Sequence, residues 1–160
     1  MRYFGFILVF LLMEPQLAEA QRLRGKTDTL TVVSYNIENF FNPTDDPEKN
    51  DDDFTPEGAY HWTESRLRIK AGRIARVISS VNGWNIPDIV GLCEIEGPEA
   101  VELLLRRGRL RRYYEGLCFP TSDGRGIATA MLYRKDRVEV LHSQAIVTSS
   151  PERRFFTRDI

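Results

Sequence analysis

The stretch that most constrains the fold is a short apolar run that ends in one carboxylate, Pro87-Asp88-Ile89-Val90-Gly91-Leu92-Cys93-Glu94. Its nearly continuous apolar residues predict a strand that is covered on both faces, as in an α/β protein, rather than one half exposed to water. The strand is expected to end at Glu94, because Glu96-Gly97-Pro98 breaks the strand pattern. Because a buried strand fixes the residue at its end, Glu94 is a candidate ligand. On this stretch alone, a solvated strand end is the simpler interpretation.

Strand and helix patterns alternate along the chain before strands take over. One helix is predicted from Thr63, which can cap it, to Asn82-Gly83, and a second from Pro98 to Gly108. Residues 39–58 are rich in Asp, Asn and Pro and predict a long loop. The other predicted strands cover residues 30–35, 113–119, 127–134 and 138–147, with a further one starting at 155.

The first two strands are expected to be parallel neighbours. Right-handed crossovers would place both helices on one face of the sheet. The carboxyl ends of the two strands would then lie at one edge, so that Asn36, at the end of the first strand, would lie near Glu94. Ligands bind at this edge in layered α/β folds. The expectation depends on the two strands being adjacent.

Asn36 and Glu94 together could hold one hard divalent cation. Mg²⁺ binds proteins through one or two carboxylates, keeps several waters and leaves room for a phosphate oxygen; Mn²⁺ and Ca²⁺ are alternatives. A bound phosphate also needs cationic partners. Arg125, in a glycine-flanked turn, and Arg158 are the candidates, because a planar guanidinium matches phosphate geometry. Taken singly, each arginine is more simply a surface charge.

Other chemistries fit the sequence less well. The acidic stretch 45–53 does not match an EF-hand from either plausible start, which leaves a solvated loop or a weak ion site. His61 and His142 have no recognisable Ser or Cys nucleophile context, which disfavours a hydrolase triad. The net charge of −1 gives no overall attraction to nucleic acid or membrane. The arginines in 106–112 suit a helix C-terminus and need not bind DNA.

The first twenty residues have the features of a signal peptide. A positive residue precedes an apolar segment, residues 3–13, that is too short for a membrane anchor, and Ala18-Glu19-Ala20 is a cleavage signal. We expect an exported protein, periplasmic or secreted, with a lead-in over residues 21–29 and no stable membrane anchor. Cys93 and Cys118 could pair in such a protein or remain buried thiols.

Three stretches resemble motifs of the endonuclease/exonuclease/phosphatase superfamily, whose fold is that of pancreatic deoxyribonuclease. Residues 35–41, Tyr-Asn-Ile-Glu-Asn-Phe-Phe, resemble its opening motif, and residues 87–94 look like its second motif, which ends in a metal-binding glutamate. Residues 124–133, Gly-Arg-Gly-Ile-Ala-Thr-Ala-Met-Leu-Tyr, are similar to the strand that follows. The resemblance covers residues 30–160, and the segment 42–62 resembles exported bacterial members.

This resemblance implies a four-layer α/β/β/α sandwich and metal-assisted hydrolysis of a phosphoester. It implies that Glu94 is a metal ligand and Asn36 a polar neighbour of the metal or phosphate, so that these two are the expected catalytic residues. Arg125 and Arg158 are implied as phosphate contacts. The implied substrate is nucleic acid or another phosphodiester, with lipid or inositol phosphates as the alternative. No protein partner is implied.

The sequence also departs from the family pattern. The family's Gly-Asp-x-Asn and Ser-Asp-His motifs supply a water-orienting aspartate and a catalytic histidine, and neither occurs after Tyr133. We therefore expect residues 30–160 to be the N-terminal part of such a domain, and the 160-residue chain alone to have little or no hydrolase activity. The alternative is a non-catalytic binding or remnant protein on the same scaffold.

Overall fold

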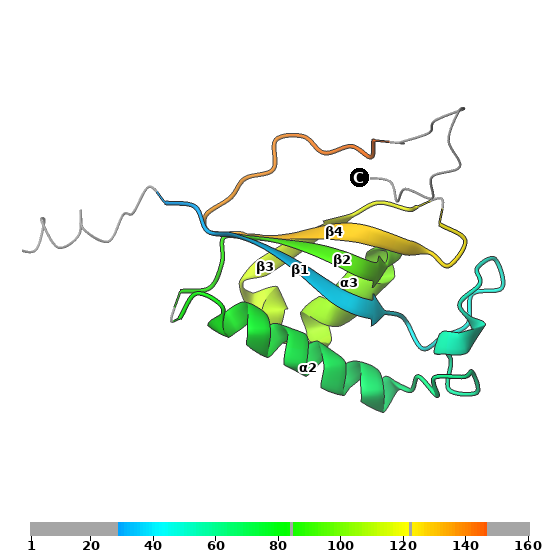
Figure 1. Cartoon of the computed structure of the whole chain (residues 1–160). Coiled ribbons are helices and arrows are strands. Elements are labelled where there is room, and N and C mark those ends of the chain that lie inside the picture. Colours follow the sequence, from blue (N-terminus) through cyan, green and yellow to red (C-terminus); the bar gives the residue numbers. More distant parts are fainter. Residues whose placement is uncertain (1–28, 84, 122, 147–160) are drawn as a thin grey trace, which may run out of the picture.

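Four strands form one mixed sheet in the order β1-β2-β4-β3 (Figure 1). The strands are β1 (Val32–Phe40), β2 (Ile89–Glu96), β3 (Tyr114–Cys118) and β4 (Ile127–Arg134). Strand β1 is parallel to β2, whereas β4 is antiparallel to both β2 and β3. This pairing confirms the prediction that the first two strands are parallel neighbours. The computed structural model describes residues 29–83, 85–121 and 123–146.

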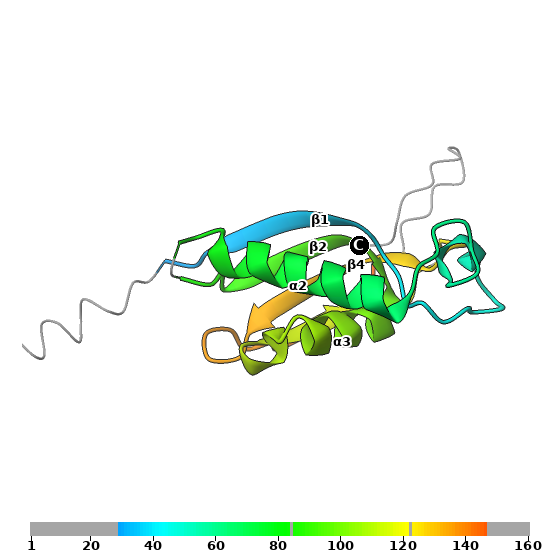
Figure 2. The same ribbon diagram turned by 90° about the horizontal axis from the view of Figure 1, so that it is seen from below.

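Both helices, α2 (Glu64–Ser80) and α3 (Gly97–Arg107), cover the same face of this sheet (Figures 1 and 2). Two short 3-10 helices, η1 (Asp52–Phe54) and η2 (Leu110–Arg112), lie in the connections. This arrangement on one face was predicted from the crossover rule. It follows that the core lies between the sheet and the two helices.

Helix α2 begins where the sequence places its cap. The Thr63 hydroxyl accepts a hydrogen bond from the Arg66 amide, which satisfies one free donor of the first turn. Buried residues then recur along one face of the helix, at Leu67, Ala71, Ile74, Ala75 and Ile78. This stripe packs in one cluster with the inward side chains of the sheet, which include Val90, Leu92 and Leu132.

Helix α3 is fixed at both ends by glycine. It begins at Gly97, one residue before the predicted Pro98, and Gly97 has a φ of +60°. At the other end, a Cβ on Gly108 would lie 2.8 Å from the Leu104 carbonyl and 3.0 Å from the Ala75 Cβ. Glycine is therefore required where the end of α3 approaches α2.

Two predicted strand ends were too early. Strand β1 was expected to stop at Asn36 but continues to Phe40, after a register irregularity between these two residues. Strand β2 was expected to end near Glu94 but continues to Glu96 across an irregularity between Cys93 and Ile95. In both cases polar residues interrupt the apolar pattern while the ladder resumes beyond a bulge.

The predicted strand over residues 138–147 is wrong for the part that the structure describes. Residues 138–146 have no regular secondary structure, and Leu141 is 88% exposed. Alternating side chains make a strand only where a neighbouring edge accepts its hydrogen bonds. Residue 147 and the predicted start of a strand at 155 lie outside the described residues.

The described residues form one sheet with helices on one face, which is a mixed α/β architecture. The four-layer sandwich is not confirmed, because the second sheet that it requires is not found within the described ranges. On the face away from the helices, Val32 is 62% exposed, and Ser34 and Asn36 are also exposed. No helix in the described part of the chain is both long and apolar enough to span a bilayer.

Candidate active site

Strands β1 and β2 bring Asn36 and Glu94 together at their irregularities. The Asn36 Nδ2 donates a hydrogen bond of 2.9 Å to the Glu94 Oε1, and in the β1–β2 register Asn36 lies opposite Cys93. Parallel pairing thus brings together two residues that are 58 positions apart. This proximity was predicted from the expected order of the strands, and the geometry agrees.

The backbone at this edge is unusual. Glu94 has a φ of +64°, and Glu38 and Asn39 have φ values of +55° and +58°. Each lies within a register irregularity of its strand. A left-handed conformation costs a non-glycine residue of the order of 1–3 kcal/mol and is concentrated at functional sites, as bulges are. Two adjacent bulges at Glu94 and Glu38 therefore mark this edge as a candidate site.

Asn36 uses both ends of its amide. Its Oδ1 accepts a 2.8 Å hydrogen bond from the Glu38 amide, which leaves its Nδ2 directed at the Glu94 carboxylate. A side chain that bonds the amide two residues ahead forms an Asx turn, which stabilises the bend in β1. Asn36 therefore orients Glu94 and shapes the bulge at the same time.

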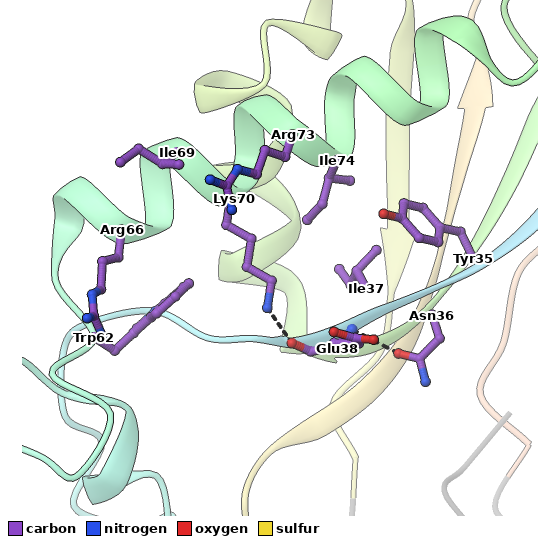
Figure 3. A pocket seen from close by; sticks show the side chains of 10 residues that line it. All are labelled: Tyr35, Asn36, Ile37, Glu38, Trp62, Arg66, Ile69, Lys70, Arg73 and Ile74. Carbon is purple, nitrogen blue, oxygen red and sulfur yellow. Dashed lines mark hydrogen bonds between the residues drawn. The ribbon is translucent and has the colours of Figure 1, made fainter.

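Lys70 connects helix α2 to the same bulge (Figure 3). Its ammonium donates to the Glu38 carbonyl and, at 3.2 Å, to the Asn39 carbonyl. It lies 5.4 Å from the centre of the Trp62 ring, and the Trp62 Nε1 donates to the Phe41 carbonyl at 2.9 Å. Burial lowers the pKa of Lys70, while the charges of Glu38 and Glu94 oppose the shift.

A groove of about 640 Å³ opens beside this bulge, between β1 and α2 (Figure 3). Its charged lining comprises Arg66, Lys70 and Arg73 from the helix and Glu38 from the strand. The remaining lining residues are Tyr35, Asn36, Ile37, Trp62, Ile69 and Ile74. Three cations against one carboxylate, with apolar walls, make the groove suited to anionic ligands.

A buried carboxylate follows Glu94 two residues later and holds the long loop. Glu96, only 4% exposed, accepts from the Asn42 amide at 2.8 Å and from the Lys49 ammonium at 3.0 Å. Burial raises the pKa of Glu96, although both partners oppose that shift. Burial also disfavours the charge of Lys49, but its bonds to Asp46 and Glu96 outweigh this and raise its pKa. Residues 42–50 are thereby fixed against the end of β2.

Arg125 lies in the turn between β3 and β4. Because Ile127 pairs with Glu96, this turn is at the same end of the sheet as Glu94. The Arg125 amide donates to the Asp123 Oδ1 at 2.9 Å, and its guanidinium lies 3.5 Å from the same carboxylate. The exposed Arg125 side chain is thus engaged within its own turn. Arg158, the other predicted phosphate contact, lies outside the described residues.

The Asn36–Glu94 hydrogen bond involves neither the two cysteines nor the two histidines. Cys93 and Cys118 are free and only partly buried in the structure, and burial raises the pKa of Cys118 to about 11. His61 lies 3.4 Å from the Pro56 carbonyl, and His142 lies 3.4 Å from the Gln144 Oε1. His142 belongs to the irregular segment, so its expected place in a strand is wrong.

Sequence reasoning missed three residues of this edge. Glu38 could have been found from its two-residue spacing to Asn36, which puts both on one side of a strand before the bulge. Lys70 and Trp62 gave no such signal. Lys70 lies on the polar side of α2, and its role depends on a contact with carbonyls 31 and 32 residues earlier in the chain.

A model of the Endonuclease/Exonuclease/phosphatase family matches residues 31–160. The chain therefore belongs to this family, as its motifs indicated. The family is generally hydrolytic and acts on phosphoesters, commonly with divalent metal ions. No curated protein and no solved structure gives a significant match.

Proposed function

We propose that this protein is a metal-dependent phosphoesterase that hydrolyses phosphodiester bonds of nucleic acid. The observation that carries the proposal is the Asn36–Glu94 pair, built on two adjacent bulges beside a cationic groove. Family membership supplies the reaction class. Lipid or inositol phosphates are the alternative substrates, because the same anionic chemistry would suit the groove.

The residues present fit a hard cation such as Mg²⁺. Glu94 offers a partly exposed carboxylate at the bulge of β2, and magnesium needs only one or two carboxylates because it keeps several waters. In the described ranges, no group of three or more His, Cys, Asp or Glu side chains could hold a metal ion, so Glu94 would be the main protein ligand. When bound, Mg²⁺ would act as a Lewis acid toward phosphate. Mn²⁺ and Ca²⁺ are the other candidates.

The chain's own residues would then position the ester. Asn36 fixes the orientation of Glu94 through its 2.9 Å bond, and Lys70 holds the bulge from the other side. Arg125 would contact phosphate after its guanidinium leaves Asp123. This ion pair lies at the surface and is weak, so a phosphate can replace the Asp123 carboxylate as its partner. We assign the same role to Arg158.

The test is hydrolysis of DNA and of a simple phosphodiester with and without Mg²⁺, using the protein with its complete family domain. Glu94→Gln keeps the side-chain shape and removes the charge, so we expect loss of metal-dependent turnover and of Mg²⁺ binding by calorimetry. The 160-residue chain should bind Mg²⁺ with little turnover. Equal ligand binding by both forms of the complete domain, with turnover in neither, would instead favour a non-catalytic binding protein.

We further propose that the protein is exported and that the mature chain begins at Gln21. The apolar segment and the cleavage signal before it support this proposal. N-terminal sequencing of the protein from the producing cell would identify Gln21 as the first residue. An intact Met1 in the mature protein would contradict it.

A further inference from the structure

The surface of helix α2 is strongly basic, and its positive charge is concentrated at the groove. The helix carries five cations and one acid, Glu64, which already pairs with Arg107. Arg66, Lys70 and Arg73 are spaced by four and three residues, so they lie along one side of the helix and line the groove. Two further cations, Arg68 and Arg76, are exposed but do not line it.

The three cations of the groove are not equally available to a ligand. Lys70 is held by the carbonyls of Glu38 and Asn39. Arg66 donates one hydrogen bond to the Tyr60 carbonyl, which leaves most of its five donors unused. Arg73 is exposed and forms no ion pair with the residues that the structure describes. Arg66 and Arg73 are therefore the groups that can bind an anion.

The spacing of these two arginines favours a ligand with repeated charges. Seven residues of helix separate them by about 10 Å along the axis, at 1.5 Å per residue. Two cations separated in this way along one groove match a strand that carries successive phosphates, because each arginine can then contact a phosphate of its own. The apolar walls, which include Trp62 and Ile69, provide the other feature of single-strand sites, where aromatic side chains accompany a basic track.

The size and the position of the groove further restrict the class of ligand that fits it. A volume of about 640 Å³ is that of a small-ligand site, which admits a short stretch of one strand. Asn36 lines the groove and also bonds Glu94, so a strand bound there leads directly to the candidate active site. We propose that the β1–α2 groove binds single-stranded nucleic acid next to the reacting phosphate. This inference rests on the proposed function and names its substrate class.

The experiment measures binding without turnover. Fluorescence anisotropy of a short labelled single-stranded DNA is recorded in EDTA over a series of salt concentrations. Arg66→Gln with Arg73→Gln should weaken binding by at least about tenfold and reduce the slope of log K against log salt by about 1.4, since each lost contact with a single strand contributes about 0.7. Arg73→Gln alone, at an exposed position, guards against a folding effect of the Arg66 change.

The matched control removes equal charge from the same helix. Arg68→Gln with Arg76→Gln should keep the affinity for the single-stranded DNA within about threefold of the wild type. Charges outside the groove act on the bound strand only at long range, where salt screens them. Equal losses in the two double variants, absence of wild-type binding, tighter binding of duplex DNA, or preference for anionic phospholipid vesicles would each overturn the proposal.

The result of the DNA-binding experiment can be distinguished from the result of the hydrolysis experiment that tests the proposed function. If Glu94→Gln abolishes hydrolysis while the groove variants bind DNA like the wild type, only the groove assignment fails. If groove-specific binding is observed but no metal-dependent hydrolysis occurs in the complete domain, the groove stands and the enzymatic proposal fails.

Discussion

Replacing Lys70 by methionine tests whether the bulge at the end of β1 is held in place from helix α2. Methionine keeps an unbranched side chain of similar length against Trp62 but cannot donate to the carbonyls of Glu38 and Asn39. Those two residues have left-handed backbone conformations, which persist only when the surroundings impose them. We therefore expect Lys70→Met to relax the bulge and to release Asn36 from its bond with the Glu38 amide.

The size of the effect follows from the contacts that are lost. Charge-assisted hydrogen bonds contribute about 1.5–3 kcal/mol, and the second bond of Lys70, at 3.2 Å, is the weaker of the two. The cation–π contact with Trp62 adds about 0.5 kcal/mol. Removing a half-buried charge returns part of its desolvation cost, as the lowered pKa of Lys70 indicates. We expect a net loss of about 2 kcal/mol in the free energy of unfolding.

The assay combines urea unfolding with Mg²⁺ titration calorimetry. Because Lys70 acts through Asn36 on Glu94, we expect the affinity for Mg²⁺ to fall by about tenfold, as for other groups that orient a metal ligand. Lys70→Arg keeps charge and donors and should restore most of that affinity. Arg68→Met, on the same helix outside the groove, is the matched control. Unchanged Mg²⁺ affinity in Lys70→Met, or an equal loss in Lys70→Arg, would refute the reasoning.

Two further predictions concern buried polar groups. Tyr114→Phe removes a hydroxyl that donates to the buried Pro87 carbonyl at 2.6 Å. Thermal and urea unfolding should show that the free energy of unfolding falls by about 1–2 kcal/mol. An unchanged free energy of unfolding would mean that the carbonyl finds another donor. Asp51 is 1% exposed, its carboxylate oxygens accept no hydrogen bond from the described residues, and burial raises its pKa. Asp51 therefore binds its proton more tightly in the folded protein than in the unfolded chain, and its charge costs stability at neutral pH. Asp51→Asn should gain about 1 kcal/mol at pH 7 in urea unfolding. The gain should shrink as the pH falls toward the ordinary aspartate pKa of about 3.9; a loss at pH 7 would contradict this.

The sequence was a good guide wherever a local pattern has one structural solution. The apolar run before Glu94, the Thr63 cap and the Gly108 end of α3 each predicted an element that the structure contains. The parallel pairing of two strands then followed from the handedness of crossovers, and with it the meeting of Asn36 and Glu94. Strand topology thus predicted a contact between two residues that are 58 positions apart in the chain.

The errors have a common physical origin in long-range contacts. The bulges that extend β1 and β2 are stabilised by Lys70 and by the Asn36 side chain, neither of which a two-residue periodicity can reveal. The prediction of a strand at 138–147 is wrong for the converse reason. The residues are typical of a strand, but a strand also needs a neighbouring strand edge that accepts its hydrogen bonds, and residues 138–146 form no strand. The local sequence determines which secondary structure a segment can adopt, and contacts with distant segments determine whether it forms.

The same reasoning explains why the candidate site is built from so few specialised residues. Glu94 is one carboxylate among many, and its left-handed conformation distinguishes it only after β1 and β2 have paired. Strain at Glu94 and Glu38 is tolerated because the Asn36 amide and the Lys70 ammonium bond to both sides of the bulge. The contacts that fix the site therefore come from the Asn36 side chain of β1 and from one side chain of α2, Lys70. Loss of the Lys70 ammonium should lower both the affinity for Mg²⁺ and the free energy of unfolding, whereas changes elsewhere on the exposed side of α2 should change neither.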